Sequence, residues 1–374
     1  MSSRIAIVLF NLGGPDDPDA VRPFLFNLFN DPAIIGVPGP LRWLLAQFIS
    51  RRRAPVAREI YAHLGGKSPL LELTQEQAEA LETEVSKTRD AKVFITMRYW
   101  HPMSDETVRA VKAYAPDEII LLPLYPQFST TTVGSSLKDW RRAAARAGLE
   151  APTKSVCCYP LDSGWIAAQA DVIGKAIKAM PEMQAGTPAR VLFSAHGLPK
   201  KIIEAGDPYQ WQVEQTAQAV VDAVEGVVDW SICYQSRVGP LEWIGPSLDD
   251  ELLRAAADGV AVVVVPIAFV SEHSETLVEL DIEYRREAAR LGVPDYRRVP
   301  AVAVHPAFIS GLAGLVERLL AVPSGTVYGG AEGRRICPAA WGQCGCTKLD
   351  VAVTRCLKFP ARCFFGSKPC TSSA

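Results

Sequence analysis

Apolar and polar residues recur along the chain with two different periods, and these periods predict the secondary structure. Short runs rich in β-branched residues are typical of strands that are covered on both faces. Between most of them lie longer segments with the apolar spacing of an amphipathic helix. We predict strands at 4–10, 92–98, 118–123, 153–158, 190–195, 228–233, 260–266 and 297–303. We predict helices at 72–88, 104–115, 163–180, 207–224 and 304–320.

Strands that alternate with helices indicate βα units and a parallel sheet. At roughly 100 to 200 residues per domain, the 374 residues of the chain suggest two domains. We therefore predict an α/β fold with two Rossmann-like domains, each a four-stranded parallel sheet flanked by helices, with a cleft between them. The expected bounds are 1–165 for the first domain, 166–322 for the second and 323–374 for a Cys-rich C-terminal extension.

Composition narrows the class of protein. The chain is 48% hydrophobic and 21% charged, which is ordinary for a soluble globular protein. The net charge of −2 does not favour a nucleic-acid-binding surface, so no nucleic-acid partner is expected. The longest apolar run, Val260 to Val265, is far shorter than the roughly 18 residues of a membrane-spanning helix. Together with an N-terminal segment too short for a signal peptide, this predicts a cytoplasmic protein.

One candidate for chemistry is the histidine in the segment 193–199, Phe-Ser-Ala-His-Gly-Leu-Pro. An apolar strand precedes it, and Gly197 and Pro199 break the chain after it, so His196 is expected in the loop at the carboxyl end of that strand. Ligands bind at those ends in open α/β sheets, and a histidine exchanges protons near neutral pH. A loop histidine bonded only to backbone is an equally good interpretation of this segment alone.

A second candidate is a row of carboxylates after the strand 260–266. Glu275, Glu279 and Glu283 recur every fourth residue and would stack along one face of a helix. Like charges at this spacing destabilise an isolated helix by a few tenths of a kcal/mol per pair, although such a row is often only a solvated face. Because this helix also follows a strand end, it should open on the same crevice as His196. An imidazole beside a carboxylate can remove protons or bind Fe²⁺.

Two glycine-containing segments resemble nucleotide-binding loops but lack their defining residues. The segment 11–15, Asn-Leu-Gly-Gly-Pro, follows the first strand without the pattern G-x-G-x-x-G. The segment 65–68, Gly-Gly-Lys-Ser, lacks the earlier glycine of a P-loop, because that position is Tyr61. We therefore expect no nucleotide cofactor.

The segment 31–53 contains an apolar helical face followed by three arginines, Arg51 to Arg53. We expect a lid helix that packs this face on the core. The alternative is an apolar lip at the mouth of the cleft, able to touch a bilayer or a hydrophobic substrate. The face consists of Leu41, Leu44, Leu45, Phe48 and Ile49, with Trp43 beside it.

Six of the nine cysteines lie after residue 336. In a reducing compartment this clustering favours a metal or cluster site over disulfides. Cys337, Cys344 and Cys346 have the spacing C-x₆-C-x-C, and three such ligands need a fourth for a [2Fe–2S] cluster or a tetrahedral zinc site. Structural zinc and free thiols stay open as alternatives. We assign no role to the regularly spaced Cys356, Cys363 and Cys370.

Many ungapped motifs, in order from about residue 5 to 310, resemble the ferrochelatase family. The resemblance implies a lyase that inserts Fe²⁺ into protoporphyrin IX, the last step of haem biosynthesis, and releases two protons without an organic cofactor. A non-catalytic tetrapyrrole- or haem-binding protein and a related cobalt chelatase are the alternatives. The motifs lie at 11–15, 66–69, 97–102, 125–129, 193–199, 206–209, 234–243 and 266–284.

The resemblance also implies residue roles. His196 would be the base that takes the pyrrole protons and a metal contact, and Glu275 would be its partner across the cleft. His273 and Glu279 would lie on the path of iron or protons. The implied porphyrin pocket consists of Leu12, Arg98, Tyr99, Tyr125 and Trp243, with Ser236 and Arg53 as propionate contacts and Val56 at a position that is basic in some relatives.

Some ferrochelatases carry a [2Fe–2S] cluster with three ligands from a C-terminal extension and one from the N-terminal half. In this chain the extension would supply Cys337, Cys344 and Cys346, while the remote position of the animal-type pattern is Thr130. Cys158 is the predicted substitute, with Cys157 as the runner-up. A homodimer and a peripheral contact with the inner membrane stay open as further partner arrangements.

Overall fold

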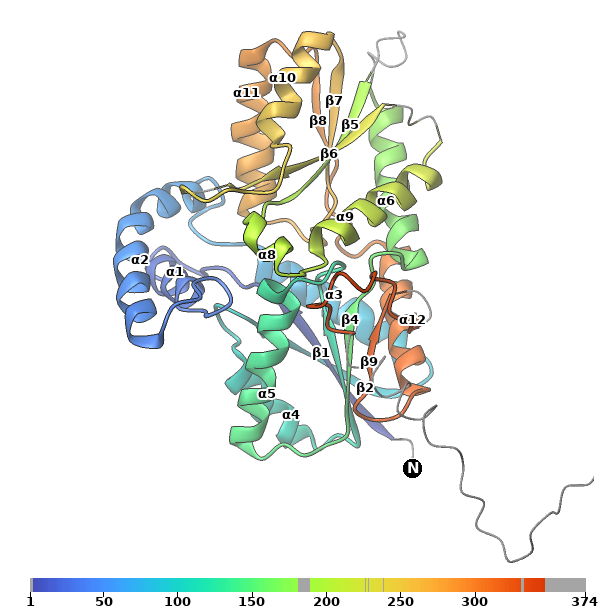
Figure 1. The fold of residues 1–374 in the computed structure, drawn as a ribbon. Coiled ribbons are helices and arrows are strands. Elements are labelled where there is room, and N and C mark those ends of the chain that lie inside the picture. The colour runs from blue at the N-terminus through green and yellow to red at the C-terminus, as the bar shows by residue number, and fades with distance from the viewer. Residues whose placement is uncertain are drawn as a thin grey trace, which may run out of the picture.

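The computed structural model describes residues 3–180, 189–225, 227, 229–237, 239–330 and 333–346. Its strands form two separate parallel sheets, and helices cover both faces of each (Figure 1). We call the part around the five-stranded sheet the first lobe and the part around the four-stranded sheet the second lobe. The predicted α/β class with two parallel, helix-flanked sheets is confirmed.

The sheet of the first lobe has the strand order β2-β1-β3-β4-β9. Strand β1 contains an unbroken buried run from Ile5 to Phe10, in which every residue is at most 2% exposed. Such a run is expected for a strand whose two faces are both covered by helices. The strands are β1 (Arg4–Asn11), β2 (Asp90–Met97), β3 (Glu118–Pro123), β4 (Thr153–Cys158) and β9 (Val327–Gly329).

The sheet of the second lobe has the order β6-β5-β7-β8. Strand β5 lies between β6 and β7, and its last residue, His196, is in register with Gln235 of β6. The ends of these strands therefore meet at one edge of the sheet. The strands are β5 (Ala189–His196), β6 (Trp230–Gln235), β7 (Ala261–Pro266) and β8 (Tyr296–Arg298).

Helices fill the connections between the strands, and two of them, η1 and η2, are π-helices. Before the second sheet begins, the structure has α1 (Val21–Phe29), α2 (Gly39–Ala62), α3 (Leu70–Val85), α4 (Ser104–Tyr114), η1 (Thr130–Gly134), α5 (Ser135–Ala147) and α6 (Ser163–Lys178). After β5 it has α8 (Lys200–Glu204), α9 (Tyr209–Ala223), α10 (Leu248–Asp258), η2 (Glu275–Tyr284), α11 (Arg285–Leu291) and α12 (Pro306–Leu320). None of the described helices is long and apolar enough to span a bilayer.

Each sheet is enclosed by two pairs of helices. In the first lobe α3 and α12 cover one face and α4 and α5 cover the other, while α6 and α9 face α10 and α11 across the second sheet. Helix α6 joins the lobes, because its buried Trp165 packs in the first and Ile173 packs in the second. Helices α1 and α2 project to one side near the junction of the lobes (Figure 1).

The chain returns to the first lobe after the second sheet is complete. Helix α12, within the predicted second domain 166–322, packs Phe308 and Leu312 on the first sheet. Strand β9, within the predicted extension 323–374, pairs with β4. The prediction of four strands per sheet is therefore corrected to five in the first lobe. The missed strand has only three residues, too few for a recognisable strand pattern, and the predicted strand 297–303 is likewise shortened to β8.

Candidate active site

His196 is the last residue of strand β5, one position before the loop in which it was expected. The amide of Gly197 donates to the carbonyl of Gln235, and the hydroxyl of Ser194 donates to the Gln235 side chain at 2.8 Å. A β-carbon at position 197 would lie 3.0 Å from that carbonyl and 3.4 Å from the Trp243 ring, so only glycine fits without displacement. The strand end is therefore held rigidly, with the imidazole at the sheet edge.

Glu275 is the first residue of η2, which follows β7 and a short loop. Its Oε2 lies 3.0 Å from Nδ1 of His196. The sequence predicts this pair correctly as neighbours at the sheet edge but wrongly as partners across a gap: both side chains come from the second lobe and touch directly. The wider turns of a π-helix, which are frequent at functional sites, are not visible in the spacing of the glutamates.

The pair is electrostatically matched. Burial alone lowers the pKa of His196, but the charge and hydrogen bond of Glu275, with a smaller contribution from Glu279, raise it above its usual value. Burial alone raises the pKa of Glu275, but the attraction and hydrogen bond of His196, with the nearby His273, lower it to about 2. The two groups therefore stabilise each other as an imidazolium and a carboxylate.

The other members of this group have distinct environments. Nε2 of His273 lies 3.9 Å from Oε2 of Glu275, and burial lowers the pKa of His273 despite that neighbour. Glu279 accepts hydrogen bonds from the amide of Ser236 at 2.8 Å and from its hydroxyl at 2.5 Å. Burial and the neighbouring Glu275 raise the pKa of Glu279. The third glutamate of the row, Glu283, is exposed.

Ser236, predicted as a propionate contact, is thus bonded to Glu279 in this structure. Its φ of +60° lies in the left-handed region that non-glycine residues rarely adopt. The bend turns both its amide and its hydroxyl toward Glu279. Trp243, predicted to line the pocket, packs next to Gly197, and among the described residues its indole nitrogen is buried without a hydrogen-bond partner.

On the first lobe, Arg98 and Tyr99 follow the end of β2 and share one carboxylate that the sequence analysis missed. Asp31 accepts from the Arg98 guanidinium at 2.8 Å and from the Tyr99 hydroxyl at 2.8 Å. The hydroxyl of Ser135 also bonds Asp31, while accepting from Nε of Arg98 at 2.7 Å. Asp31 is only 3% exposed in the structure, and no local pattern in the sequence indicates that burial.

Tyr61 is a second residue that the sequence analysis did not predict. It lies near the end of α2 and packs with Leu12 and Tyr99 in one apolar cluster. Burial raises the pKa of Tyr61 to about 12, with a hydrogen bond from Ser274 opposing the shift and the charge of Glu275 adding to it. Tyr61 therefore packs with the predicted porphyrin residues of the first lobe and lies close enough to η2 for the charge of Glu275 to affect its pKa.

The remaining predicted pocket residues lie on the first lobe. Tyr125 is half-buried near Arg98, and burial raises the pKa of its hydroxyl. Arg53 is exposed on α2, with its guanidinium 5.9 Å from the centre of the Phe29 ring. Val56 is also exposed on α2.

The structure brings five cysteines into one buried pocket at the junction of β4 and the loop 333–346. The sulfurs of Cys157, Cys158 and Cys346 lie within 4.8 Å of one another, and Cys337 and Cys344 are buried in the same cluster. The predicted set of four and the runner-up are thus all together. Cys356, Cys363 and Cys370 lie outside the described residues.

A β-bulge explains why two adjacent cysteines face the same pocket. Val156 pairs with Tyr328 and Cys158 pairs with Gly329, so Cys157 is an extra residue in β4. In a regular strand, adjacent side chains point to opposite faces, and a bulge changes that alternation. A β-carbon at position 329 would overlap the sulfur of Cys346, so glycine is required where β9 closes the pocket.

The apolar helical face of the segment 31–53 is exposed, which corrects the expectation that it packs on the core. Helix α2 instead buries small residues, Ala46, Ser50 and Ala54, which allow close packing. The large apolar residues point outward over the projecting end of the molecule. Those that are at least 38% exposed in this region are Ile34, Leu41, Trp43, Leu44, Phe48 and Val56.

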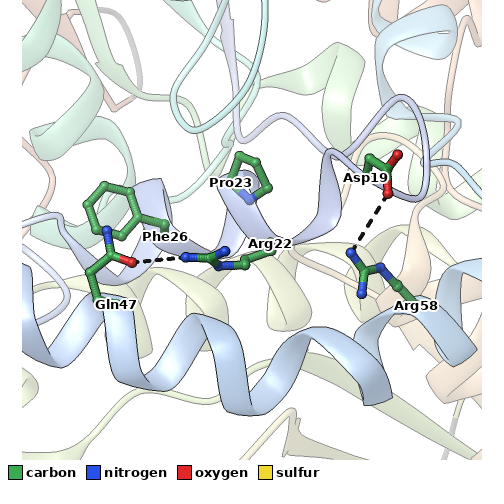
Figure 2. Close-up of a pocket in the computed structure, with 6 residues that line it drawn as sticks. All are labelled: Asp19, Arg22, Pro23, Phe26, Gln47 and Arg58. Carbon is green, nitrogen blue, oxygen red and sulfur yellow. Dashed lines mark hydrogen bonds and ion pairs between the residues drawn. The ribbon is translucent and has the colours of Figure 1, made fainter.

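A shallow groove of about 400 Å³ lies between α1 and α2. Figure 2 shows two polar links across it: Arg22 donates to the Gln47 side chain at 3.1 Å, and Arg58 pairs with Asp19 at 3.9 Å. None of the predicted site residues lines this groove. Because its arginines already have partners and lie on the surface, we assign it no part in the chemistry of His196.

Comparison with known proteins gives one consistent family. The family described as ferrochelatase matches residues 4–320. A ferrochelatase from Caulobacter vibrioides is 53% identical over 92% of this chain and 98% of its own length, and one from Hyphomonas neptunium is 48% identical over 92% and 95%. Among solved structures, SirB from Bacillus subtilis with Fe³⁺ has a similar fold, with a TM-score of 0.51, 14% identity and coverage of 85% of this chain and 96% of that one.

Proposed function

The chain belongs to the ferrochelatase family and inserts Fe²⁺ into protoporphyrin IX, and we propose that His196 and Glu275 carry out the proton transfer. The observation that supports this assignment is the 3.0 Å contact between the two side chains at the carboxyl edge of the second sheet. That edge is where ligands bind in open α/β sheets. The reaction replaces two pyrrole N–H bonds with bonds from nitrogen to iron and releases two protons.

His196 acts as the base in its neutral form. It takes a proton from a pyrrole nitrogen and becomes an imidazolium, which the carboxylate of Glu275 stabilises at 3.0 Å. A second proton can be taken only after the first has left. Glu279, whose pKa is raised by burial and by Glu275, is the nearest carboxyl group suited to receive and pass on a proton. His273, kept neutral by burial, is a further relay or iron contact.

The porphyrin ring lies against the His196–Glu275 pair, with the first lobe on its other side. Because the two side chains touch, no ring fits between them. The opposite wall is the cluster of Leu12, Tyr61 and Tyr99. Fe²⁺ is a substrate that meets the ring nitrogens as the protons leave.

The porphyrin carboxylates are bound near the first lobe. Arg53 is exposed on α2 and pairs with no carboxylate among the described residues, so its charge is available to a propionate. Arg98 is already paired with Asp31 and acts by shaping the pocket. The amide and hydroxyl of Ser236 both donate to Glu279, so Ser236 could contact a propionate only by releasing Glu279. A role in positioning Glu279 is therefore better supported than a propionate contact.

The cysteine pocket holds a [2Fe–2S] cluster through Cys158, Cys337, Cys344 and Cys346, with Cys157 as the alternative to Cys158. The donor set fits, because all five thiols are buried together and thiolates are the ligands of such clusters. When bound, the cluster supplies one-electron redox chemistry and cross-links β4 to the C-terminal loop. The protein contributes the bulge that directs the β4 thiols inward and the glycines that let the loop approach. The visible absorption spectrum and the iron and sulfide content of the purified protein distinguish a [2Fe–2S] cluster from a zinc site.

The exposed apolar residues of α2 contact a bilayer peripherally. Leu44 and Phe48 are 58% and 62% exposed, which is unusual for side chains of this size, and Trp43 is suited to the interface between lipid and water. Arg51 and Arg52 follow on the same helix and complement anionic headgroups. A homodimer would cover the same apolar residues. Sedimentation of the protein without lipid distinguishes the two arrangements, because only a homodimer would then have twice the mass of one chain.

The function is tested by mixing the purified protein with Fe²⁺ and protoporphyrin IX in the absence of oxygen. We expect the absorption spectrum of protohaem to develop with turnover. Binding of porphyrin without metal insertion would contradict the catalytic assignment and indicate a carrier. A preference for Co²⁺ and a different tetrapyrrole would indicate a related chelatase.

A further inference from the structure

Gln212 is a buried amide of the second lobe that contacts the cysteine pocket. Its Nε2 donates toward the sulfur of Cys337 at 3.1 Å and toward that of Cys158 at 3.4 Å. Its Oε1 accepts the backbone amide of Phe128 at 2.7 Å. Gln212 is fully buried, so all its hydrogen-bonding capacity is directed at the first lobe and the pocket. Hydrogen bonds to cluster sulfurs are one of the ways in which proteins set the potential of a cluster.

The same helix reaches the catalytic histidine one turn earlier. Tyr209 is the first residue of α9 and lies three positions before Gln212, on the same side of the helix. Its buried ring packs in one apolar cluster with Ala195 and Leu198, and these two residues lie on either side of His196 in the chain. The first turn of α9 therefore contacts the cysteine pocket through Gln212 and packs against the end of β5, which carries His196, through Tyr209.

The start of this helix is also fixed to the cysteine loop. The amide of Gln343 donates to the carbonyl of Gly206 at 3.0 Å. Asp207, 1% exposed, accepts the amide of Tyr209 at 3.0 Å and that of Thr130 at 2.7 Å. The turn before α9 is thus in direct contact with residues of both lobes.

We propose that Gln212 is a positioning residue that couples the cysteine pocket to His196 through the first turn of α9. Its two donated hydrogen bonds hold the helix against the sulfurs, and the packing of Tyr209 on Ala195 and Leu198 passes that placement on to the strand end that carries His196. The inference rests on the proposed [2Fe–2S] cluster, because a thiolate-bound cluster provides the negative sulfurs that the amide would bind most strongly. Through Gln212 and the first turn of α9, binding of the cluster in the cysteine pocket would affect catalysis at His196.

The test compares Gln212→Glu and Gln212→Leu with Gln218→Glu, a matched control on the exposed side of α9. Gln212→Glu keeps an acceptor for Phe128 but replaces the donor to the sulfurs with a negative charge. Gln212→Leu removes both functions without adding charge. For each protein, purified without oxygen, we would measure iron and sulfide content, the visible spectrum, the midpoint potential of the cluster, and kcat and KM for the porphyrin.

We expect Gln212→Glu to lower the midpoint potential or the cluster content and to reduce kcat at least threefold, with KM changed less. Gln212→Leu should change kcat in the same direction, and the Gln218→Glu control should match the wild type. Wild-type cluster properties in both Gln212 variants would overturn the inference, and so would an altered cluster with unchanged kcat. A wild-type protein without iron or sulfide would instead remove the proposed cluster itself, and the role of Gln212 with it.

Discussion

Glu275 and Glu279 lie about one turn apart on the π-helix η2, yet their pKa values shift in opposite directions. The pKa of Glu275 is lowered to about 2, because His196 and His273 outweigh the effect of burial. Burial and the charge of Glu275 raise the pKa of Glu279. The Glu275 carboxyl therefore stays ionised beside His196, and the Glu279 carboxyl takes up a proton more readily than an ordinary glutamate. This asymmetry suits the two glutamates to the different roles that we propose for them.

Replacing the base tests the central assignment. His196→Ala should reduce kcat by about 10²- to 10⁴-fold, the usual contribution of a positioned general base. The fold should persist, because the side chain is 39% exposed and contributes little to the core. Steady-state assays and thermal unfolding followed by circular dichroism measure both effects. Turnover at the wild-type rate would refute the assignment.

The pH profile should report the ion pair. Because Glu275 raises the pKa of His196, the base keeps its proton to a higher pH than an ordinary histidine, and activity should rise as the pH increases through that raised pKa. In Glu275→Gln the stabilising charge is lost, so this acidic limb should move to lower pH while the maximal rate falls. A limb at the same pH in both proteins would show that His196 does not set it. Profiles of kcat/KM against pH are the measurement.

Asp31 should matter for both stability and substrate binding. Asp31→Ala leaves the Arg98 guanidinium, whose side chain is only 17% exposed, without its carboxylate. Removing one partner of a buried ion pair costs about 3–5 kcal/mol of unfolding free energy. Urea denaturation should detect this loss, and KM for the porphyrin should rise. Asp31→Asn can still accept hydrogen bonds and should lose less unfolding free energy. A urea midpoint of Asp31→Ala equal to that of the wild type would contradict the stabilising role of Asp31.

The cysteine pocket can be tested by single replacements. Cys344→Ser should lose the visible bands of the cluster together with its iron and sulfide. Cys157→Ser should retain them if Cys158 is the ligand from β4, and the reverse result would assign Cys157 instead. Retained bands in Cys344→Ser would exclude Cys344 as a ligand.

Membrane contact should depend on the exposed face of α2. The double variant Leu44→Glu and Phe48→Glu should float less with anionic lipid vesicles. It loses apolar contact area, and its two added carboxylates are repelled by the anionic vesicle surface. Stability should hardly change, since both side chains are exposed. Leu253→Glu on α10, where the leucine is 53% exposed, is the matched control. Equal flotation of the two variants would contradict the bilayer contact.

The sequence predicts the sheets well, because strands such as Ile5 to Phe10 are buried on both faces and are apolar throughout. It also predicts that His196 and Glu275 meet, since both follow strands that end at one edge. It could not predict their direct contact, which depends on the turn of η2. The predicted orientation of α2 was wrong for a physical reason. The helix packs through Ala46 and Ala54, and such small residues do not stand out as an apolar face in the sequence.

Cys157 and Asp31 illustrate what lies beyond sequence patterns. The alternation rule assigns Cys157 and Cys158 to opposite faces, and only the bulge against β9 brings both into the pocket. Asp31 binds residues more than 60 positions away, and no local periodicity reports such a contact. The grouping of Cys337, Cys344 and Cys346 in one pocket was predictable, because their close spacing is itself the signal.

The pairing of β4 with β9 has a consequence for how the protein is made. As the chain emerges from the ribosome, β4 has no neighbour on its outer side until the whole second lobe and residues 327–329 have followed. The first lobe therefore begins folding earliest and finishes last. Until then the two thiols of β4 lack the glycine strand and the loop that enclose them, so assembly of the cysteine pocket must be a late event in biosynthesis.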